Sequence, residues 1–469
     1  MKIAFFFVCV YENRGIPIGL SYLIPILKNR GHEVSVFETT FYNFDYSSFN
    51  LTGVIDETGK QIISDFKAFL NQNKPDLIAV SCSSLTLNFP IAILESLEKR
   101  YITVYGGVGV TVDYENVIQH ELVDYACVGF GEQCLVGLIE YLEGRQELRS
   151  IPNLVYKQSG VTIKNEFVQS FDLSSLPMPD WSLFDKRNLE RIFKGKIKRW
   201  GNFQLTRGCP FDCAYCINGY LHRELKMKVY KFPYKKIIEE IKFLSKRYNL
   251  EIVRILDECF GFGNIQYFKD FAATYKKEVG LPTIIETRPE TITSETIEIL
   301  KAMNCISVSL GIEVGSETQR KTVLHRTVSN KTTENAFTLL HKAKIRSSSF
   351  NIMGFPDDTR EKIRETIELN RKCKPEYVNI YFFLPAPGTK LRKYCLENNL
   401  LETTAIVDYS LRSVIKNRNL GHEELLGLYR TFKYYIRFPR WLFPLIKLGE
   451  KPSRLGKTVL WFLSFFYAP

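Results

Sequence analysis

One short stretch decides the fold of this chain: Thr206-Arg207-Gly208-Cys209-Pro210-Phe211-Asp212-Cys213-Ala214-Tyr215-Cys216. Its three cysteines follow a Cys-x₃-Cys-x₂-Cys spacing, and soft thiolate ligands suit zinc or iron–sulfur clusters. A structural zinc site takes four ligands, commonly from two cysteine knuckles, but the later Cys259, Cys305, Cys373 and Cys395 stand alone. Three thiolates can hold a 4Fe–4S cluster and leave its fourth iron open for chemistry. The alternatives are a zinc site with a distant fourth ligand and three buried, inert cysteines.

This spacing resembles the cluster loop of the radical S-adenosylmethionine (radical SAM) superfamily. The resemblance implies that Cys209, Cys213 and Cys216 hold a 4Fe–4S cluster whose open iron chelates S-adenosylmethionine. Reductive cleavage of that cofactor gives a 5′-deoxyadenosyl radical, which takes a hydrogen atom from the substrate. Tyr215 matches the family's aromatic position beside the adenine.

Length and composition narrow the class of protein. A chain of 469 residues should form two or three domains with an ample core. Its 11 cysteines, without a signal peptide, favour a reducing compartment, so we expect a cytoplasmic protein. The apolar start, Met1 to Val10, is too short to span a bilayer and predicts a buried strand. The net charge of +12 gathers in residues 186–199 and after Lys416 without a recognisable nucleic-acid fold, which argues against a nucleic-acid partner.

Strand and helix patterns alternate through the first third of the chain. This alternation predicts an α/β domain over residues 1–150 with a doubly wound parallel sheet. Ligands of such sheets bind beyond the carboxyl ends of the strands. The predicted strands are Ile3–Val10, His32–Phe37, Leu77–Ser81, Ile102–Tyr105 and Tyr125–Val128, and the predicted helices are Gly19–Lys28, Pro90–Lys99 and Gln133–Glu143.

Three loops at these strand ends are rich in glycine and hydroxyl groups. With the segments Pro17–Leu23 and Gly31–Val34, they resemble the cobalamin-binding domain that precedes many radical SAM enzymes. The Asp-x-His-x-x-Gly motif that supplies a cobalt-binding histidine elsewhere is missing, and His32 is interpreted as a turn residue. A retained fold that has lost its ligand is the alternative. The resemblance implies that cobalamin is bound by Ser83, Ser84, Leu85, Thr86, Gly106, Gly107, Gly109, Gly131 and Glu132.

A linker over residues 151–198 and a second α/β domain over residues 199–395 follow. Prolines mark the linker, Val155–Val161 reads as a hairpin, and the basic run Lys194–Arg199 is a solvated surface or meets an anionic group. Six strand–helix repeats then match the partial (β/α)₆ barrel of the radical SAM family. The predicted strands are Asn202–Thr206, Ile252–Leu256, Thr283–Glu286, Ile306–Ile312, Ser348–Met353 and Tyr377–Phe383.

Barrel chemistry gathers at the carboxyl ends of the strands. Leu256–Phe260, Glu286–Pro289 and Ser309–Ser316 follow three of these strands and resemble the family's SAM-binding segments. A strand-end ion pair is the alternative for Glu286 and Arg288. Cys259 is interpreted as a small polar filler, and the alternative is that it approaches the cluster or the substrate. The resemblance implies that SAM is bound by Tyr215, Asp257, Glu258, Glu286, Arg288, Gly311 and Glu313.

The tail, residues 396–469, is predicted to be helical over Glu423–Tyr435 and then mixes aromatic, apolar and basic residues. Such a mixture suits the inner face of a membrane or a lid over the barrel. Peripheral membrane contact and a lipid-linked substrate are therefore expectations beside a small-molecule substrate.

The resemblance implies three cofactors: a 4Fe–4S cluster, S-adenosylmethionine and cobalamin. The expected function is cobalamin-dependent methylation of an unactivated carbon, with an electron donor such as flavodoxin or ferredoxin. A radical cyclase or rearrangement enzyme without methyl transfer is the first alternative. A non-catalytic corrinoid- or metal-binding protein is the second, although such a carrier would not require the strand-end acids.

Overall fold

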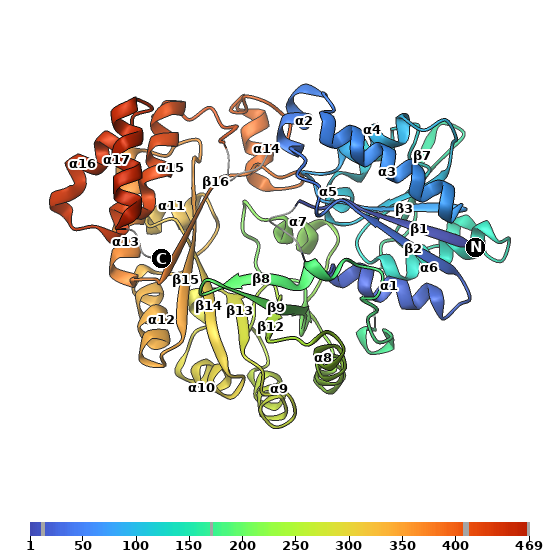
Figure 1. The fold of residues 1–469 in the computed structure, drawn as a ribbon, viewed down its shortest axis with the longest axis horizontal. Coiled ribbons are helices and arrows are strands. Elements are labelled where there is room, and N and C mark those ends of the chain that lie inside the picture. Colours follow the sequence, from blue (N-terminus) through green and yellow to red (C-terminus); the bar gives the residue numbers. More distant parts are fainter. Residues whose placement is uncertain (11–14, 169–171, 407–411, 467–469) are drawn as a thin grey trace.

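The computed structural model describes residues 1–10, 15–168, 172–406 and 412–466. It contains two seven-stranded sheets, one for each predicted α/β domain, and a group of helices at the C-terminal end (Figure 1). The prediction of a doubly wound sheet followed by a partial barrel and a helical tail is confirmed.

The N-terminal sheet has the strand order β2-β1-β3-β4-β5-β6-β7. Its first five strands are parallel, as predicted. The hairpin that the sequence places in the linker pairs antiparallel with β5 and extends this sheet. The strands are β1 (Lys2–Phe7), β2 (Glu33–Glu38), β3 (Leu77–Ser81), β4 (Ile102–Gly106), β5 (Tyr125–Cys127), β6 (Leu154–Gln158) and β7 (Val161–Lys164).

Helices cover both faces of this sheet. Leu20 of α1 and Leu135 of α6 are buried on one face, and Phe66 of α3 and Val110 of α5 are buried on the other. The sequence did not predict α2, α3 or α5, and α5 begins inside the loop expected after β4. The helices are α1 (Ile18–Lys28), α2 (Tyr46–Thr52), α3 (Glu57–Asn73), α4 (Asn88–Glu95), α5 (Val108–Val117) and α6 (Gly131–Leu142), followed by the 3₁₀ turn η2 (Leu148–Ser150).

The second sheet has the order β16-β15-β14-β13-β12-β9-β8 and curves into a partial barrel. Six parallel strands, β9 and β12 to β16, form this sheet, as predicted. The predicted bounds of the first were wrong: β9 begins at Lys196 and overlaps the predicted Asn202–Thr206 only at Asn202 and Phe203, because residues 196–199 pair with β8 instead of ending the linker. An antiparallel strand, β8, extends its edge. The strands are β8 (Glu190–Phe193), β9 (Lys196–Phe203), β12 (Ile252–Ile255), β13 (Thr283–Thr287), β14 (Cys305–Glu313), β15 (Arg346–Met353) and β16 (Tyr377–Phe382), with a short pair, β10 (Thr206–Arg207) and β11 (Tyr230–Lys231), beside them.

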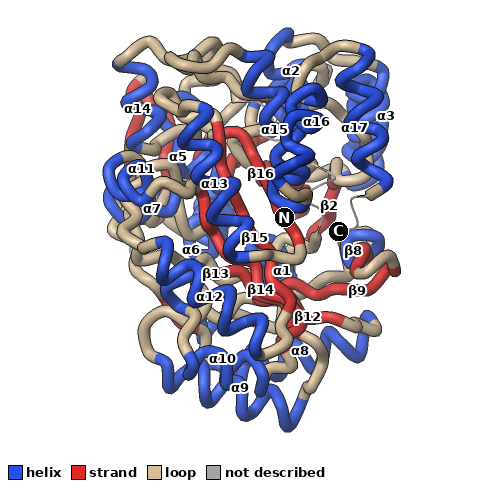
Figure 2. The backbone as a smooth tube through the Cα atoms, turned by 90° about the vertical axis from the view of Figure 1, so that its left-hand side faces the viewer, coloured by secondary structure: helices blue, strands red, loops and turns tan. Residues whose placement is uncertain are grey.

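The helices of this domain follow its strands in sequence, and α8, α9, α10, α12 and α13 lie on the outer face of the sheet (Figure 2). They are α7 (Ile217–Glu224), α8 (Tyr234–Tyr248), α9 (Ile265–Glu278), α10 (Ser294–Ala302), α11 (Glu317–Thr322), α12 (Asn330–Lys342), α13 (Arg360–Cys373) and α14 (Lys390–Glu397). The 3₁₀ turns η3 (Leu173–Ser175), η4 (Lys186–Leu189) and η5 (Pro289–Thr291) lie in the connections.

The two domains share one hydrophobic core. Tyr22 of α1 stacks on Phe232 beyond β11, with ring centroids 6.0 Å apart. The Tyr22 hydroxyl donates a buried 2.7 Å hydrogen bond to Glu240 of α8, which also pairs with Lys236. Packing and hydrogen bonding therefore fix the position of the N-terminal domain against the barrel.

The tail folds into three helices beside β16 and α13. These are α15 (His422–Arg437), α16 (Phe443–Gly449) and α17 (Arg454–Phe465), with η6 (Arg440–Leu442) between the first two. Arg360 of α13 forms ion pairs with Glu424 and Glu450 and fixes the group to the barrel. Within the described residues, no helix is both long enough and apolar enough to cross a membrane.

Candidate functional site

The cysteine loop leaves β10 at a turn that requires glycine. Gly208 has a φ of +98°, and a Cβ there would lie 2.4 Å from the carbonyl oxygen of Lys228. The loop then runs to Cys216, the residue before α7. All three cysteines are free thiols; Cys213 is buried, and Cys209 and Cys216 are partly exposed.

The donor set of this loop fits an iron–sulfur cluster. Burial raises the pKa of Cys209 and of Cys216 to about 12, so neither free thiol would serve as a nucleophile at neutral pH. In the described part of the chain, no three His, Cys, Asp or Glu side chains converge on one point that could hold a single metal ion. A cuboidal cluster differs, because each thiolate binds a different iron. A loop with three cysteines thus suits a 4Fe–4S cluster that keeps one iron open.

Arg288 is the predicted SAM residue that lies against a cluster cysteine. Its Nη1 donates to the sulfur of Cys213 at 3.2 Å, and its guanidinium lies 3.6 Å from the ring centroid of Phe211. Arg288 also forms an ion pair with Glu290. The end of β13 therefore brings a cation to the cysteine loop.

Asp257 forms hydrogen bonds with the chain segment that leads into the cysteine loop. Its carboxylate accepts hydrogen bonds from the backbone N–H groups of Leu205 and Thr206 and from the Thr206 hydroxyl, at 2.7–3.0 Å. Burial raises the pKa of Asp257 to about 7. The neighbouring Glu258 accepts from the N–H of Gly208 at 3.1 Å, and burial raises its pKa as well. Both acids position the chain just before the first cysteine.

A buried ion pair, Arg326 with Glu313, lies beside the Tyr215 hydroxyl. Arg326 is almost fully buried and donates to Glu313 at 2.6 Å, to the Tyr215 hydroxyl at 3.2 Å and to the carbonyl of Gly311 at 3.0 Å. A Cβ on Gly311 would lie 2.2 Å from the Glu313 carboxylate, so glycine makes room for this pair. Glu286, by contrast, forms its ion pair with Arg254 on β12. The sequence pointed to four of these residues, but it gave no sign of Arg254 or Arg326.

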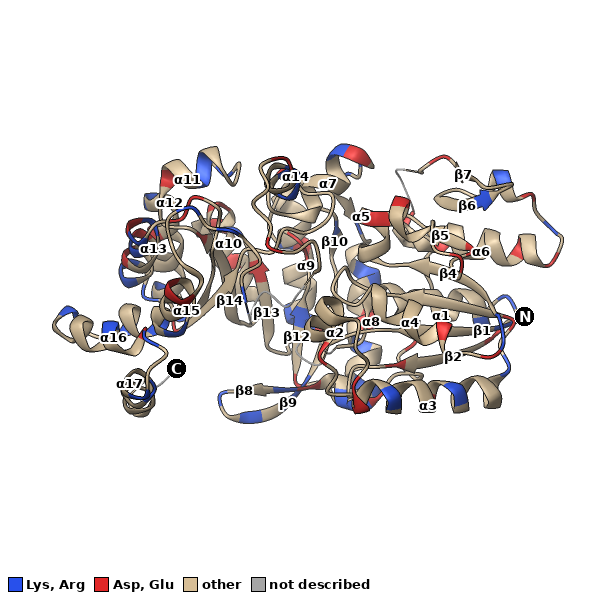
Figure 3. Cartoon of the chain, turned by 90° about the horizontal axis from the view of Figure 1, so that it is seen from above, with Lys and Arg blue, Asp and Glu red and all other residues tan. Residues whose placement is uncertain are grey.

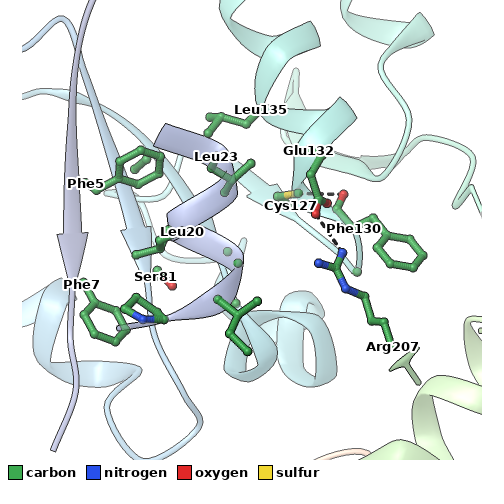
Figure 4. A pocket seen from close by; sticks show the side chains of 18 of the residues that line it. Phe5, Phe7, Leu20, Leu23, Ser81, Cys127, Phe130, Glu132, Leu135 and Arg207 are labelled. Atoms are coloured by element: carbon green, nitrogen blue, oxygen red, sulfur yellow. Dashed lines mark hydrogen bonds and ion pairs between the residues drawn. The ribbon is translucent and has the colours of Figure 1, made fainter. Parts of the chain in front are cut away.

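A cavity of about 580 Å³ opens between the two domains at the carboxyl ends of the N-terminal strands (Figure 4). Its walls are mainly apolar and include Phe5, Phe7, Leu20, Leu23 and Leu135. A Cβ on Gly19 would meet no atom within 4 Å and would stand in the cavity. An apolar wall without a side chain at Gly19 fits a broad, flat cofactor such as a corrin ring.

The predicted cobalamin residues divide into two groups. Gly106, Gly107, Gly131 and Glu132 line the cavity. The others are not among its lining residues; the Thr86 hydroxyl, for example, bonds to the Val8 carbonyl at 3.2 Å. Ser83, Ser84, Leu85 and Thr86 lie in the turn after β3. Gly109 lies in α5, where its missing side chain leaves room for the backbone of Ser83.

Arg207 joins the cavity to the cysteine loop. It lies two residues before Cys209, lines the cavity, and forms a 2.8 Å ion pair with the buried Glu132 of α6 (Figure 4). Leu256 and Glu258 of the barrel also line the cavity. Arg207 stands inside the cysteine motif, but the spacing of the motif gives no sign of this role.

Two further predicted roles concern His32 and Cys259. His32 is buried beside the chain's N-terminal amine and Glu143, in agreement with a turn residue. Cys259 is buried with its sulfur 3.9 Å from the Thr287 hydroxyl, and it interacts with Arg288 and with Cys209. Its role as a polar filler stays a prediction.

Sequence comparison assigns a family to each domain. The profile of the radical SAM superfamily matches residues 203–369, and that of the B12 binding domain matches residues 6–139. An uncharacterized methyltransferase of Pyrococcus horikoshii, PH0819, is 25% identical over 439 residues, which are 92% of this chain and 89% of the relative. The anaerobic magnesium-protoporphyrin IX monomethyl ester cyclase of Rubrivivax gelatinosus is 23% identical over 330 residues, 68% of this chain and 58% of the relative.

A solved structure shares most of this fold. The radical S-adenosylmethionine methyltransferase TsrM of Kitasatospora setae, with cobalamin and a [4Fe-4S] cluster bound, superimposes with a TM-score of 0.65. The sequences are 15% identical, and the alignment covers 84% of this chain and 75% of TsrM. At this identity the likeness establishes the fold.

Proposed function

We propose that this chain, a radical SAM enzyme with an N-terminal B12-binding domain, methylates an unactivated carbon of its substrate. The two domains account for the predicted cofactors: a 4Fe–4S cluster, S-adenosylmethionine and cobalamin. When bound, the cluster and SAM supply a hydrogen-abstracting radical, and methylcobalamin supplies the methyl group. A reductant such as flavodoxin or ferredoxin would supply the electron.

One observation carries this proposal. The cavity at the carboxyl ends of the N-terminal strands is walled on its other side by Arg207 and Glu258, which stand at the cysteine loop. Methyl transfer to a substrate radical requires the radical source and the methyl donor to face one substrate. A cavity shared by the two domains supports that proximity.

The side chains suggest separate roles. Cys209, Cys213 and Cys216 would hold the cluster, and Arg288, beside Cys213, could receive the carboxylate of SAM, since a guanidinium fork matches a carboxylate. Tyr215, held by Arg326 and Glu313, would lie beside the adenine. Asp257 is proposed as a positioning residue for the loop rather than as a SAM ligand.

The test uses full-length protein reconstituted anaerobically with iron, sulfide and cobalamin. With a chemical reductant and SAM carrying an isotopically labelled methyl group, we expect 5′-deoxyadenosine release and label in a product from a metabolite extract. The product should be heavier than its precursor by one labelled methylene unit. Release of 5′-deoxyadenosine without label in any product would refute methyl transfer.

Radical cyclisation is a second candidate, supported by the similarity to the magnesium-protoporphyrin IX monomethyl ester cyclase. A cyclase leaves the carbon count unchanged, so product mass separates the two reactions. Protein that binds cobalamin but releases no 5′-deoxyadenosine would instead be a corrinoid-binding protein.

A further inference from the structure

The C-terminal helices present a large apolar face that nothing in the described structure covers. Helix α17 packs against α16 and the core of the C-terminal helices through Gly456, Val459 and Leu463, which are buried. Its outward residues and Trp441 of η6 have exposed fractions from 49% to 76%. We call this set the C-terminal apolar face: Trp441, Leu455, Trp461, Phe462, Phe465 and Phe466.

The exposed charges of residues 437–466 have one sign, although Arg440 pairs at 2.8 Å with Glu368 of α13 outside this segment. Between residues 437 and 466 the sequence has one acidic residue, Glu450. That carboxylate is buried and bound to Arg360 and to the Tyr435 hydroxyl, so it contributes no exposed negative charge. The same segment carries six basic residues, Arg437, Arg440, Lys447, Lys451, Arg454 and Lys457.

A second element with the same character is the hairpin formed by β8 and β9. Ile192 and Ile197 are directly paired across it and are 70% and 67% exposed. Lys194 and Gly195 form its two-residue turn with φ of +49° and +71°, the geometry of a tight type I′ turn. Beside this pair, Lys194 and Lys196 are exposed at the tip.

The hairpin and α17 project from the same side of the molecule, although more than 250 residues separate them (Figures 2 and 3). Phe193 at the base of the turn contacts Arg346 at the start of β15, with the guanidinium 5.3 Å from the ring centroid. Basic residues mark both projections in Figure 3. The hairpin is part of the barrel sheet. Both elements carry exposed apolar side chains with basic residues beside them.

We propose that this side of the protein docks on the surface of an anionic lipid bilayer. Aromatic and aliphatic side chains on two separate projections would enter the interface, and the surrounding lysines and arginines would meet acidic headgroups. Helix α17, with 12 residues, would lie in the plane of the interface. The charge pattern favours lipid over a second copy of this chain, because two identical cationic faces repel each other. This inference does not depend on the proposed methyl transfer.

The test is flotation of the anaerobically reconstituted full chain with phosphatidylcholine vesicles, with and without phosphatidylglycerol. We expect binding only to vesicles that contain the anionic lipid, weakening with salt, and a blue shift of the tryptophan emission. Lys451→Gln with Lys457→Gln should reduce partitioning about fivefold for each charge removed. Trp461→Ser with Phe465→Ser, and separately Ile192→Thr with Ile197→Thr, should each reduce it further.

The matched control is Val54→Thr with Val161→Thr, which changes two valines that are 66% and 63% exposed in the N-terminal domain. It should bind vesicles like the parent protein. Absence of binding to anionic vesicles, or equal binding by the control and the α17 variant, overturns the proposal. So does a dimer that the α17 variant converts to monomer without any vesicle binding by the parent. The lysine variants keep the test decisive if an apolar variant misfolds.

Discussion

The carboxyl ends of the strands carry different kinds of residues in the two sheets. At the barrel, charged side chains bond to one another and to the cysteine loop: Arg326 to Glu313, Arg254 to Glu286, and Arg288 to Cys213. At the N-terminal sheet, the cavity wall is apolar and glycine-rich, and its one described ion pair is Glu132 with Arg207.

This difference follows from what each site is proposed to hold. A small zwitterionic cofactor and an anionic cluster need directional donors that are in place before the ligand arrives. A large ring held mostly by its apolar surface needs space and smooth walls. Substitutions should therefore act through charge in the barrel and through volume in the N-terminal domain.

The largest effect is expected for Cys213→Ala. Loss of one of three thiolates should abolish the cluster, its visible absorption and 5′-deoxyadenosine release, while cobalamin remains bound in the separate cavity. The control Cys259→Ala should retain the cluster. A Cys213→Ala protein that keeps a cuboidal-cluster spectrum would contradict the assignment of the loop.

Arg326→Met tests the charged network. It leaves Glu313 buried without its partner, and breaking such a pair costs about 3–5 kcal/mol of stability. Thermal unfolding should shift accordingly, with weaker binding of SAM. Arg254→Met is the matched control, because its pair with Glu286 is partly exposed and worth about 1 kcal/mol or less. Equal destabilisation by the two variants would show that burial does not distinguish the pairs.

Gly19→Leu tests the cavity through volume alone. The new side chain would stand in the space now open at this position, and overpacking of about 1–3 kcal/mol corresponds to a roughly tenfold to hundredfold loss of cobalamin affinity. Cobalamin retained after gel filtration measures the effect. Gly421→Leu, where a Cβ also meets no atom within 4 Å, should retain cobalamin normally; unimpaired retention by Gly19→Leu would place the cofactor elsewhere.

Asp257→Asn should have the smallest effect, one on pH dependence. Burial raises the pKa of Asp257 to about 7, above its unfolded value of about 3.9. The folded state therefore binds the proton more tightly, and the resulting stabilisation, full below about pH 4, is lost as the pH rises through about 7. Asparagine does not titrate, so the fall in melting temperature between about pH 4 and 7 should be smaller in the variant. Parallel pH profiles of the two proteins would disprove this linkage.

The sequence predicted most accurately the elements whose residue pattern alone determines their structure. Leu77–Ser81 was predicted with its observed bounds, because a buried parallel strand is a continuous apolar run. Helix α5 was missed, since Val108–Val117 is rich in β-branched residues and owes its helical form to packing. Helix α3 was overlooked although Ile62, Phe66 and Leu70 recur at helical spacing.

The sequence predicted the site residues that belong to motifs, but not the distant residues that pair with them. Asp257 was recognised as a strand-end acid, but no local pattern could show that its carboxylate turns back toward Thr206. Arg326 lies 111 residues beyond Tyr215, and Glu132 lies 75 residues before Arg207. Such pairs arise only when the folded chain brings distant segments together.

The Glu132–Arg207 pair has a consequence for how this protein can evolve. Each half of the molecule supplies part of the other half's wall, so neither can be exchanged for a homologous segment without mismatched charges at the junction. In related proteins, substitutions at Glu132 and Arg207 should therefore occur together, so that the two residues keep opposite charges. This constraint adds to the Tyr22–Phe232 and Tyr22–Glu240 contacts, which also join the two domains.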